Sequence, residues 1–400
     1  MNSALDALKP YPFARLAELK AGLRPPGDRE HIALSIGEPR HAAPDFVIAQ
    51  LSDPAFLRQS LGTYPATRGT PALREALADW LQRRFGAPVD PETQVLPVAG
   101  TREALFSIAQ AVLDPKRDSV VAMPNPFYQI YEGAALLGGG RPRYLPTLAE
   151  QGYRPDFDAL TPADWREIDL LYLCTPGNPA GATLSLADLQ QLLALAHEHD
   201  FVIVSDECYS EIYADESAPP PGLLTATTAL GDSAHHRALV FNSLSKRSNL
   251  PGLRSGLVAG DAALLDGYLR YRTYQGCALP VHTQAVSALA WADEAHVRHN
   301  RVLYREKFDA VDPILKRIAP VQRPAGGFFY WLPVPGDDRA FAAQLFESEH
   351  VTVLPGQFLG RPAGAAGLNP GAGHVRIALV ADLPQCLEGA ERIARCEALW

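Results

Sequence analysis

One lysine of this chain stands in a setting that favours chemistry at its amine. Lys246 follows the apolar run 238–241, which is typical of a buried strand, and hydroxyl side chains precede it at Ser243 and Ser245. Arg254 follows a few residues later. Open α/β sheets bind their ligands just beyond the carboxyl ends of such strands. Two hydroxyls, an amine and a guanidinium at this place suit a phosphate group beside a reactive amine.

That arrangement is expected when a lysine carries a Schiff base to pyridoxal phosphate, with Ser243, Ser245 and Arg254 holding the phosphate. A basic, solvated loop is the alternative interpretation, because most lysines near strand ends lie on the surface. Considered alone, Lys246 would favour the interpretation as a surface loop. The residues at the other strand ends are therefore needed to distinguish the two interpretations.

Two further strand ends carry polar residues that suit the same ligand. Thr101 and Arg102 open a predicted helix after the strand 94–98, and a helix N-terminus attracts anions such as phosphate. An ordinary helix cap is the alternative there. Asn178 follows the strand 169–174 and can donate to a ring oxygen, although turn chemistry alone also explains Pro-Gly-Asn-Pro.

A carboxylate ends the next apolar strand, 201–205. Asp206 at such a place is costly to bury unless it is paired, and a protonated pyridine nitrogen would be a suitable partner. Tyr209, three residues on, could reach the phenolic oxygen of the ring. Alternatively, Asp206 caps the following helix. Together the four strand-end motifs favour the cofactor site over four separate structural explanations.

The elements that must position these residues alternate along the chain. Apolar strands separated by amphipathic helices, such as 70–81, 103–113 and 186–199, predict an α/β fold with a mostly parallel, doubly covered sheet. One or two long helices within 282–318 and strands near 328–332 and 374–379 predict a smaller α+β domain. We expect residues 1–44 to form an N-terminal arm and part of the small domain, 45–285 the large cofactor-binding domain, and 286–400 the small C-terminal domain.

Composition restricts the partners. The 400 residues carry a net charge of −9 without a block of basic residues, which argues against nucleic acid or an anionic membrane as partner. The five cysteines are scattered, so neither a disulfide framework nor a metal site is expected. The N-terminus does not resemble a signal peptide, and no apolar run approaches the ~20 residues that span a bilayer. We therefore expect a cytoplasmic protein.

Over nearly its whole length the chain resembles the class I and II aminotransferases of pyridoxal-phosphate fold type I. The segments that carry the resemblance, in the family's order, are 34–39 (Leu-Ser-Ile-Gly-Glu-Pro), 64–69, 124–131, 176–179, 206–209, the Lys246 segment and 374–377.

The resemblance implies a role for each site residue. Lys246 would bind the cofactor and move the proton between substrate and cofactor, Asp206 would pair with the ring nitrogen, and Tyr128 would stack on the ring. Asn178 and Tyr209 would bond the phenolic oxygen. Arg376 and the Gly37 backbone would hold the substrate α-carboxylate. The phosphate would be bound by Thr101, Arg102, Ser243, Ser245 and Arg254, and by Tyr64 from the partner in a homodimer with shared active sites. The prolines after Asn125 and Asn178 would follow cis bonds.

Within the family the chain is most similar to the proteobacterial N-succinyldiaminopimelate aminotransferases of lysine biosynthesis. Segments 8–13, 124–133, 243–256, 271–277 and 351–356 carry this similarity. It implies ping-pong transfer from glutamate to N-succinyl-2-amino-6-oxopimelate. Such substrates carry a second carboxylate, for which Arg272 and Arg40 are candidates, with solvated surface arginines as the alternative.

Other functions remain open at this point. An aminotransferase for acetylornithine, aspartate or an aromatic amino acid would use the same residues, as would a pyridoxal-phosphate β-lyase of the same fold. A cofactor-binding regulator is disfavoured, because such proteins join this fold to a DNA-binding domain for which the N-terminal segment leaves little room.

Overall fold

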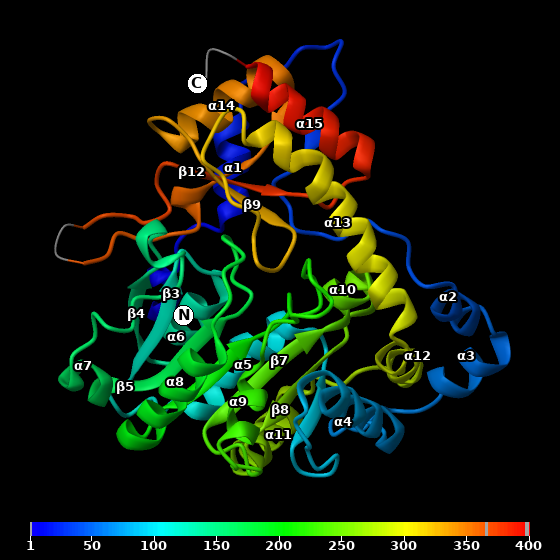
Figure 1. Ribbon diagram of the computed structural model, residues 1–400. Helices are drawn as coiled ribbons and strands as arrows, with labels where there is room; N and C mark the ends of the chain where they lie inside the picture. Colours follow the sequence, from blue (N-terminus) through cyan, green and yellow to red (C-terminus); the bar gives the residue numbers. More distant parts are fainter. Residues whose placement is uncertain (1, 365–366, 397–399) are drawn as a thin grey trace.

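A seven-stranded sheet forms the centre of the larger part of the molecule in the computed structural model, which describes residues 2–364, 367–396 and 400 (Figure 1). The strand order is β2-β8-β7-β6-β5-β3-β4. Only β8 runs antiparallel to its neighbours β2 and β7, and the other neighbouring pairs are parallel. This confirms the predicted mostly parallel sheet. The strands are β2 (Val95–Val98), β3 (Val120–Asn125), β4 (Arg141–Pro146), β5 (Ile168–Cys174), β6 (Val202–Asp206), β7 (Ala238–Ser243) and β8 (Gly256–Gly260).

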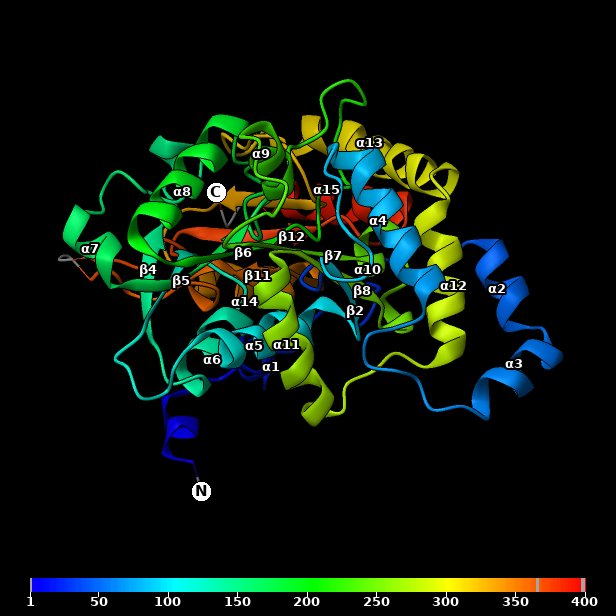
Figure 2. The same cartoon turned by 90° about the horizontal axis from the view of Figure 1, so that it is seen from below.

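Helices cover both faces of this sheet, as the view from below shows (Figure 2). Because both faces are covered, the central strands are apolar along their whole length. One face packs against α4 (Pro71–Phe85), α8 (Leu186–His199), α9 (Leu223–Ala229) and α12 (Val281–Ala292). The other packs against α5 (Thr101–Val112), α6 (Ile130–Leu137) and α11 (Ala262–Gln275).

The helix ends follow from local chemistry. Thr70 caps α4 by accepting the Leu73 N–H at 3.4 Å, Pro71 occupies the first turn, and Gly86 ends the helix in the left-handed region. Ser185 and Asp188 form a capping box at the start of α8. These signals lie in the sequence itself, and the predicted helices start within two residues of where they are found.

The strand β4 was not predicted. Its residues include two arginines and two prolines, a composition that does not read as a strand. β4 lies at the edge of the sheet and pairs only with β3, so prolines and charged side chains are tolerated there.

The smaller part of the molecule combines both ends of the chain. β1 (Ile32–Ala33) pairs in parallel with β10 (Val351–Thr352), and β11 (Leu354–Pro355), β12 (His374–Ala378) and β9 (Phe329–Pro333) form an antiparallel sheet. Helices α1 (Pro12–Lys20), α14 (Asp338–Glu349) and α15 (Leu383–Arg395) pack around these strands (Figure 1). The domain boundaries themselves stay a prediction.

One long helix connects the two parts. α13 (Ala295–Leu315) begins beside α12 and continues to α15 (Figure 1). Its second half contributes Phe308, Val311 and Leu315 to the core of the smaller part. The short helices α2 (Asp45–Leu51) and α3 (Pro54–Leu61) pack near α12, and α7 (Pro162–Glu167) lies beside α8. No helix among the residues described above is long and apolar enough to cross a membrane.

The sheet topology brings the predicted site residues to one edge. β2, β3, β5, β6 and β7 all end at this edge, where Thr101, Tyr128, Asn178, Asp206 and Lys246 follow. β8 runs in the opposite direction, so its first residue, Gly256, pairs with Ser243 and Val98 at the same edge. Arg254, just before β8, therefore reaches the place where the other strands end.

Candidate active site

A cavity of about 740 Å³ lies at this edge of the sheet, beneath the smaller part of the molecule. It is lined by residues from both parts of the chain. The predicted site residues that line it are Gly37, Thr101, Arg102, Tyr128, Asn178, Asp206, Tyr209, Ser243, Ser245, Lys246, Arg254 and Arg376. The structure therefore brings together residues as far apart in the sequence as Gly37 and Arg376.

Lys246 belongs to the short helix α10 (Leu244–Arg247) and points into the cavity. Its Nζ donates a hydrogen bond to the Gly37 carbonyl at 2.5 Å and lies 5.4 Å from the centre of the Phe328 ring. Removal from water lowers the pKa of Lys246 to about 8, because burial disfavours the charged amine. A substantial fraction of the amine is thus neutral near physiological pH, as a nucleophile must be.

Asp206 is buried at the end of β6 and is held by two donors. The Tyr131 hydroxyl donates to its Oδ2 at 2.7 Å, and the Cys208 N–H donates to Oδ1 at 3.2 Å. Burial raises the pKa of Asp206, and both hydrogen bonds oppose that rise. A carboxylate in this position is suited to a cationic partner within the cavity.

An anion site lies at the N-terminus of α5. Within the described part of the chain no side chain caps this helix, which leaves its first-turn N–H groups available to a ligand. The guanidinium of Arg254 lies against Gly100, whose φ is +86°, and a Cβ on Gly100 would collide with it. Ser243 and Ser245, at the start of α10, line the same cavity. Hydroxyls, a guanidinium and free amides are the groups that bind phosphate.

Arg376 on β12 forms the opposite wall of the cavity and is 4 % exposed. Its Nη1 donates to Asn178 Oδ1 at 2.7 Å and its Nη2 to the Ser35 carbonyl at 2.8 Å, while Nε is buried without a partner. Burial lowers the pKa of Arg376 to about 10. Its guanidinium lies 4.3 Å from the centre of the Phe329 ring, which restricts its orientation. A fixed, planar cation of this kind suits a carboxylate.

The outer part of the cavity contains a third arginine, besides Arg254 and Arg376. Arg102 Nε donates to the Tyr128 hydroxyl at 2.6 Å, and Nη2 donates to the hydroxyl of Tyr11 at 3.3 Å. Tyr11 comes from the segment before α1, so the arginine connects the large sheet to the N-terminal arm. Its side chain remains exposed, whereas its backbone N–H belongs to the anion site of α5.

The remaining two predicted arginines lie elsewhere, which corrects that expectation. Arg272 is 0 % exposed, and its Nη1 donates to Oε1 and Oε2 of Glu103 at 2.8 and 2.9 Å. Its guanidinium is thus paired within the chain and does not line the cavity among the residues described. Arg40 is exposed and is not part of the cavity lining among the residues described.

Tyr64 is 99 % exposed and does not line the cavity of its own chain. Its expected role lies in a partner subunit and stays a prediction. The peptide bonds before Pro126 and Pro179 are cis, as predicted, and so is the bond before Pro176.

Some functional neighbours escaped prediction from sequence. Tyr131 lies in the segment 124–131 and Tyr11 in the segment 8–13, but the sequence predicted no site role for either residue. Tyr131 is fully buried on α6 and stacks on Tyr172, with ring centres 4.8 Å apart. A helical spacing of three residues from Tyr128 was the available signal, but an aromatic residue in an apolar helix is more often part of the core.

The donor set therefore fits a phosphate ester attached to a pyridine ring: free amides and Arg254 for the phosphate, Asp206 for a ring nitrogen, and Lys246 for an aldehyde. The fold and this site define a pyridoxal-phosphate-dependent enzyme of fold type I. The comparisons with known proteins agree, because residues 29–393 match the family described as aminotransferase class I and II. This chain belongs to that family, and its cofactor is pyridoxal 5′-phosphate.

Individual relatives give the same family. An aminotransferase of Neisseria meningitidis shares 48% sequence identity and a TM-score of 0.93, over 98% of this chain and 99% of that one. The LL-diaminopimelate aminotransferase of Desulforudis audaxviator is 32% identical over 97% of this chain and 96% of its own length. A structure titled probable N-succinyldiaminopimelate aminotransferase, from Thermus thermophilus, shares 26% identity with a TM-score of 0.83, covering 96% of this chain and 99% of that one.

Proposed function

We propose that this aminotransferase moves an amino group between glutamate and N-succinyl-2-amino-6-oxopimelate. The observation that carries the proposal is that two arginines besides Arg254 line the same cavity, Arg376 beside Asn178 and Arg102 at the outer part. Both proposed substrates carry an α-carboxylate beside the reacting carbon and a second carboxylate at a distance. The relatives named for diaminopimelate substrates support the same substrate class.

The proposed roles follow from the contacts. Bound pyridoxal phosphate supplies an electron sink for the electrons of the breaking Cα–H bond. Lys246 would bind the cofactor and would move the proton at Cα as a general acid and base. Asp206 would keep the ring nitrogen protonated. Arg376 and the Gly37 backbone would orient the substrate carboxylate. Asn178 and Tyr209 would bond the phenolic oxygen, Tyr128 would stack on the ring, and the phosphate would be held by Thr101, Arg102, Ser243, Ser245 and Arg254.

Arg102 takes the place in this proposal that Arg272 and Arg40 held in the expectation from sequence. Its backbone N–H faces the phosphate, and its exposed guanidinium is free to turn toward a distal carboxylate at the cost of two tyrosine contacts. An exchange of hydroxyl partners for a carboxylate is favourable, because a carboxylate adds the attraction of an opposite charge and can accept two parallel N–H bonds from the guanidinium.

The proposal includes a homodimer. Tyr64 is almost fully exposed in the single chain, and a second subunit would bring it to the phosphate of its neighbour. Sedimentation should give twice the mass of the chain, and Tyr64→Phe should weaken cofactor binding without lowering thermal stability. A monomer with full activity would contradict this part of the proposal.

A second candidate is direct transamination of LL-diaminopimelate. Two observations favour it: curated relatives at about 31% identity carry that name, and Glu38 lines the cavity, where its carboxylate could pair with the free distal ammonium of that substrate. Succinylation removes this ammonium. Glu38 would therefore pair with LL-diaminopimelate but would have no such cationic partner on the succinylated substrate.

A product-resolved assay separates the candidates. Glutamate formation from 2-oxoglutarate is followed with N-succinyl-LL-diaminopimelate, LL-diaminopimelate, acetylornithine, aspartate and an aromatic amino acid as donors. We expect the succinylated donor to give the highest kcat/KM. A higher value with LL-diaminopimelate would favour the second candidate, and release of pyruvate and ammonia from any donor would indicate a β-lyase.

A further inference from the structure

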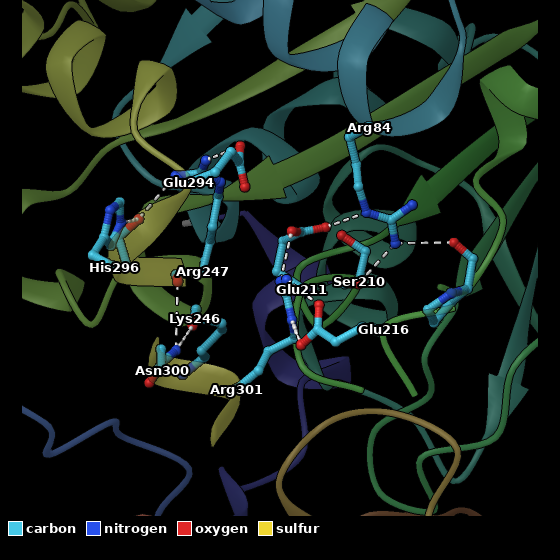
Figure 3. A network of polar contacts seen from close by, with 12 residues as sticks. Arg84, Ser210, Glu211, Glu216, Lys246, Arg247, Glu294, His296, Asn300 and Arg301 are labelled. Atoms are coloured by element: carbon cyan, nitrogen blue, oxygen red, sulfur yellow. Dashed lines mark hydrogen bonds and ion pairs between the residues drawn. The ribbon is translucent and has the colours of Figure 1, made fainter. Parts of the chain in front are cut away.

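A second buried arginine follows the reactive lysine directly in sequence. Arg247 is 1 % exposed and points away from the cavity, toward the junction between α12 and α13 (Figure 3). The proposed function uses Lys246 but assigns nothing to Arg247. Burying a guanidinium this deeply destabilises the fold unless its N–H donors find acceptors.

The donors of Arg247 meet the end of α12. Its Nη1 donates to the Ala290 carbonyl at 2.6 Å, and its Nη2 donates to the Asp293 carbonyl at 3.1 Å and to Glu294 Oε1 at 2.6 Å. The last carbonyls of a helix lack partners within the helix and carry its negative dipole end. Arg247 thus satisfies these carbonyls and pairs with a carboxylate at the same time.

Two tryptophans fix the plane of the guanidinium. Its carbon lies 5.0 Å from the centre of the Trp291 ring and 5.5 Å from that of Trp80, and the two rings are 4.5 Å apart. An arginine held by ring faces and several hydrogen bonds has little freedom to move. The backbone that it shares with Lys246 is restricted as well.

The neighbouring residues make a second set of contacts with the same junction. Ser248 Oγ lies 2.8 Å from His296 Nε2, and Asn300 Nδ2 faces the carbonyls of Lys246 and Arg247 at 3.4 Å each (Figure 3). Both partners lie in the first turns of α13, the helix that continues into the smaller part of the molecule. The lysine segment is therefore attached to the element that connects the two parts.

We propose that Arg247 is a positioning residue for Lys246. By joining α10 to the α12–α13 junction, Arg247 holds the lysine amine at the depth in the cavity where this amine reacts with the cofactor. The inference rests on the proposed role of Lys246 but is independent of which substrate is used. Loss of Arg247 should let Lys246 reach more solvated positions and so return toward the behaviour of an ordinary lysine.

The experiment measures Lys246 itself in protein freed of cofactor. Pyridoxal phosphate is added at a series of pH values, the attachment is fixed by borohydride, and the labelled Lys246 peptide is quantified by mass spectrometry. Besides burial, the ionisable groups with the largest influence on the pKa of Lys246 are Cys208, Arg376, Glu38 and Asp206, and the variants alter none of them. Arg247 is not in this set, so we attribute a change in attachment to the position of Lys246.

In Arg247→Gln we expect the midpoint of attachment to rise by about one pH unit and the rate at pH 7.5 to fall about tenfold. The matched control is Arg83→Gln, because Arg83 is exposed and also donates to the end of α12, to the Trp291 carbonyl at 3.2 Å, without contacting the lysine segment. This control should attach cofactor within about twofold of the wild-type rate, since it leaves the segment intact.

Because Arg247→Gln removes a buried charge and its hydrogen bonds, Glu294→Gln is measured beside it as a milder variant. Glu294 keeps about a third of its side chain exposed, and its substitution weakens the same attachment more gently. A threefold slower attachment is expected. Unchanged attachment in a folded Arg247→Gln protein, or in Glu294→Gln if the first does not fold, would overturn the inference, as would an equal loss in Arg83→Gln. Failure of wild-type Lys246 to attach cofactor would instead overturn the proposed function.

Discussion

The hydroxyl of Tyr131 donates a 2.7 Å hydrogen bond to Asp206 in a place where both side chains are buried. Asp206 sits at the end of β6 and Tyr131 on α6, so the bond connects the strand edge to the helix that covers it. This relationship matters for the charge of Asp206. Burial raises the pKa of the carboxyl, and the tyrosine lowers it again.

Tyr131→Phe should therefore weaken the enzyme through Asp206. Without the bond the pKa of Asp206 rises, and the carboxylate needed by the ring nitrogen is lost at higher pH than in the wild type. The acid limb of the kcat/KM profile moves to higher pH, and cofactor affinity falls about 10- to 100-fold, the range for a lost hydrogen bond to a charged group.

Tyr172→Phe is the control for this substitution. Tyr172 stacks on Tyr131 and is equally buried, but its hydroxyl donates to the Leu105 carbonyl. It should lower stability and leave the acid limb in place. Identical pH profiles for the two variants would show that Tyr131 acts only as a core residue.

Lys246→Ala should abolish turnover, with a loss of at least about 10³-fold, because the general acid and base is missing. Pyridoxal phosphate should still bind, since the phosphate site at α5 is intact. The measurement is cofactor content before and after borohydride, which fixes only covalently attached cofactor.

A second buried lysine provides the comparison for Lys246→Ala. The pKa of Lys307 is also lowered by burial to about 8, but its Nζ lies 2.6 Å from His41 Nε2, outside the cavity lining. Lys307→Met should keep borohydride-stable cofactor. Near-normal transamination by Lys246→Ala would refute the assignment of the lysine.

Arg376→Lys should impair recognition of the α-carboxylate. A lysine cannot present two parallel donors, so kcat/KM for glutamate should fall about 10- to 100-fold. The half-reaction with 4-aminobutyrate, which lacks that carboxylate, should change little. If the rates with glutamate and with 4-aminobutyrate fell equally, Arg376 would be supporting the cofactor site or the fold rather than binding the substrate carboxylate.

Much of the site could be predicted because it lies at strand ends. Lys246, Asp206 and Thr101 each follow an apolar run, and a parallel sheet gathers such positions at one edge. Arg254 was predicted from its place shortly after Lys246, and the reversed direction of β8 explains why it reaches this edge. Arg376 was predicted by resemblance alone, since no local pattern brings β12 to the other side of the cavity.

The errors arose where partners are distant in sequence. From the sequence, Arg272 was a plausible residue to bind the distal carboxylate of the substrate. In the structure its partner is Glu103, 169 residues away in the sequence. Tyr131 lies in an apolar helix and Arg247 in a basic segment, so each has a local pattern that indicates an ordinary structural role. Only the tertiary contacts distinguish these residues from their neighbours.

The placement of Arg272 leads to a prediction about stability. Its removal would leave a cavity beside Tyr268 and take the partner from Glu103, whose side chain is 23 % exposed. We expect Arg272→Ala to destabilise the protein by about 2–4 kcal/mol, somewhat less than a fully buried pair would cost. The ratio of kcat/KM for glutamate and alanine should stay unchanged. A selective loss with glutamate would restore Arg272 as a substrate residue.

Arg102→Gln should act on the distal end of the substrate. The guanidinium is exposed at the outer part of the cavity, while the backbone N–H at the phosphate site is unaffected by the substitution. We expect kcat/KM for the dicarboxylic donors to fall about 10- to 100-fold, as for a lost charge-assisted bond, with less than about threefold change for alanine. The control is Arg15→Gln on α1, close to Tyr11 in sequence but outside the cavity lining, which should leave both donors unaffected. Equal losses for alanine and glutamate in Arg102→Gln would mean that the side chain serves the phosphate or Tyr128, and the distal carboxylate would then require a residue from the partner subunit.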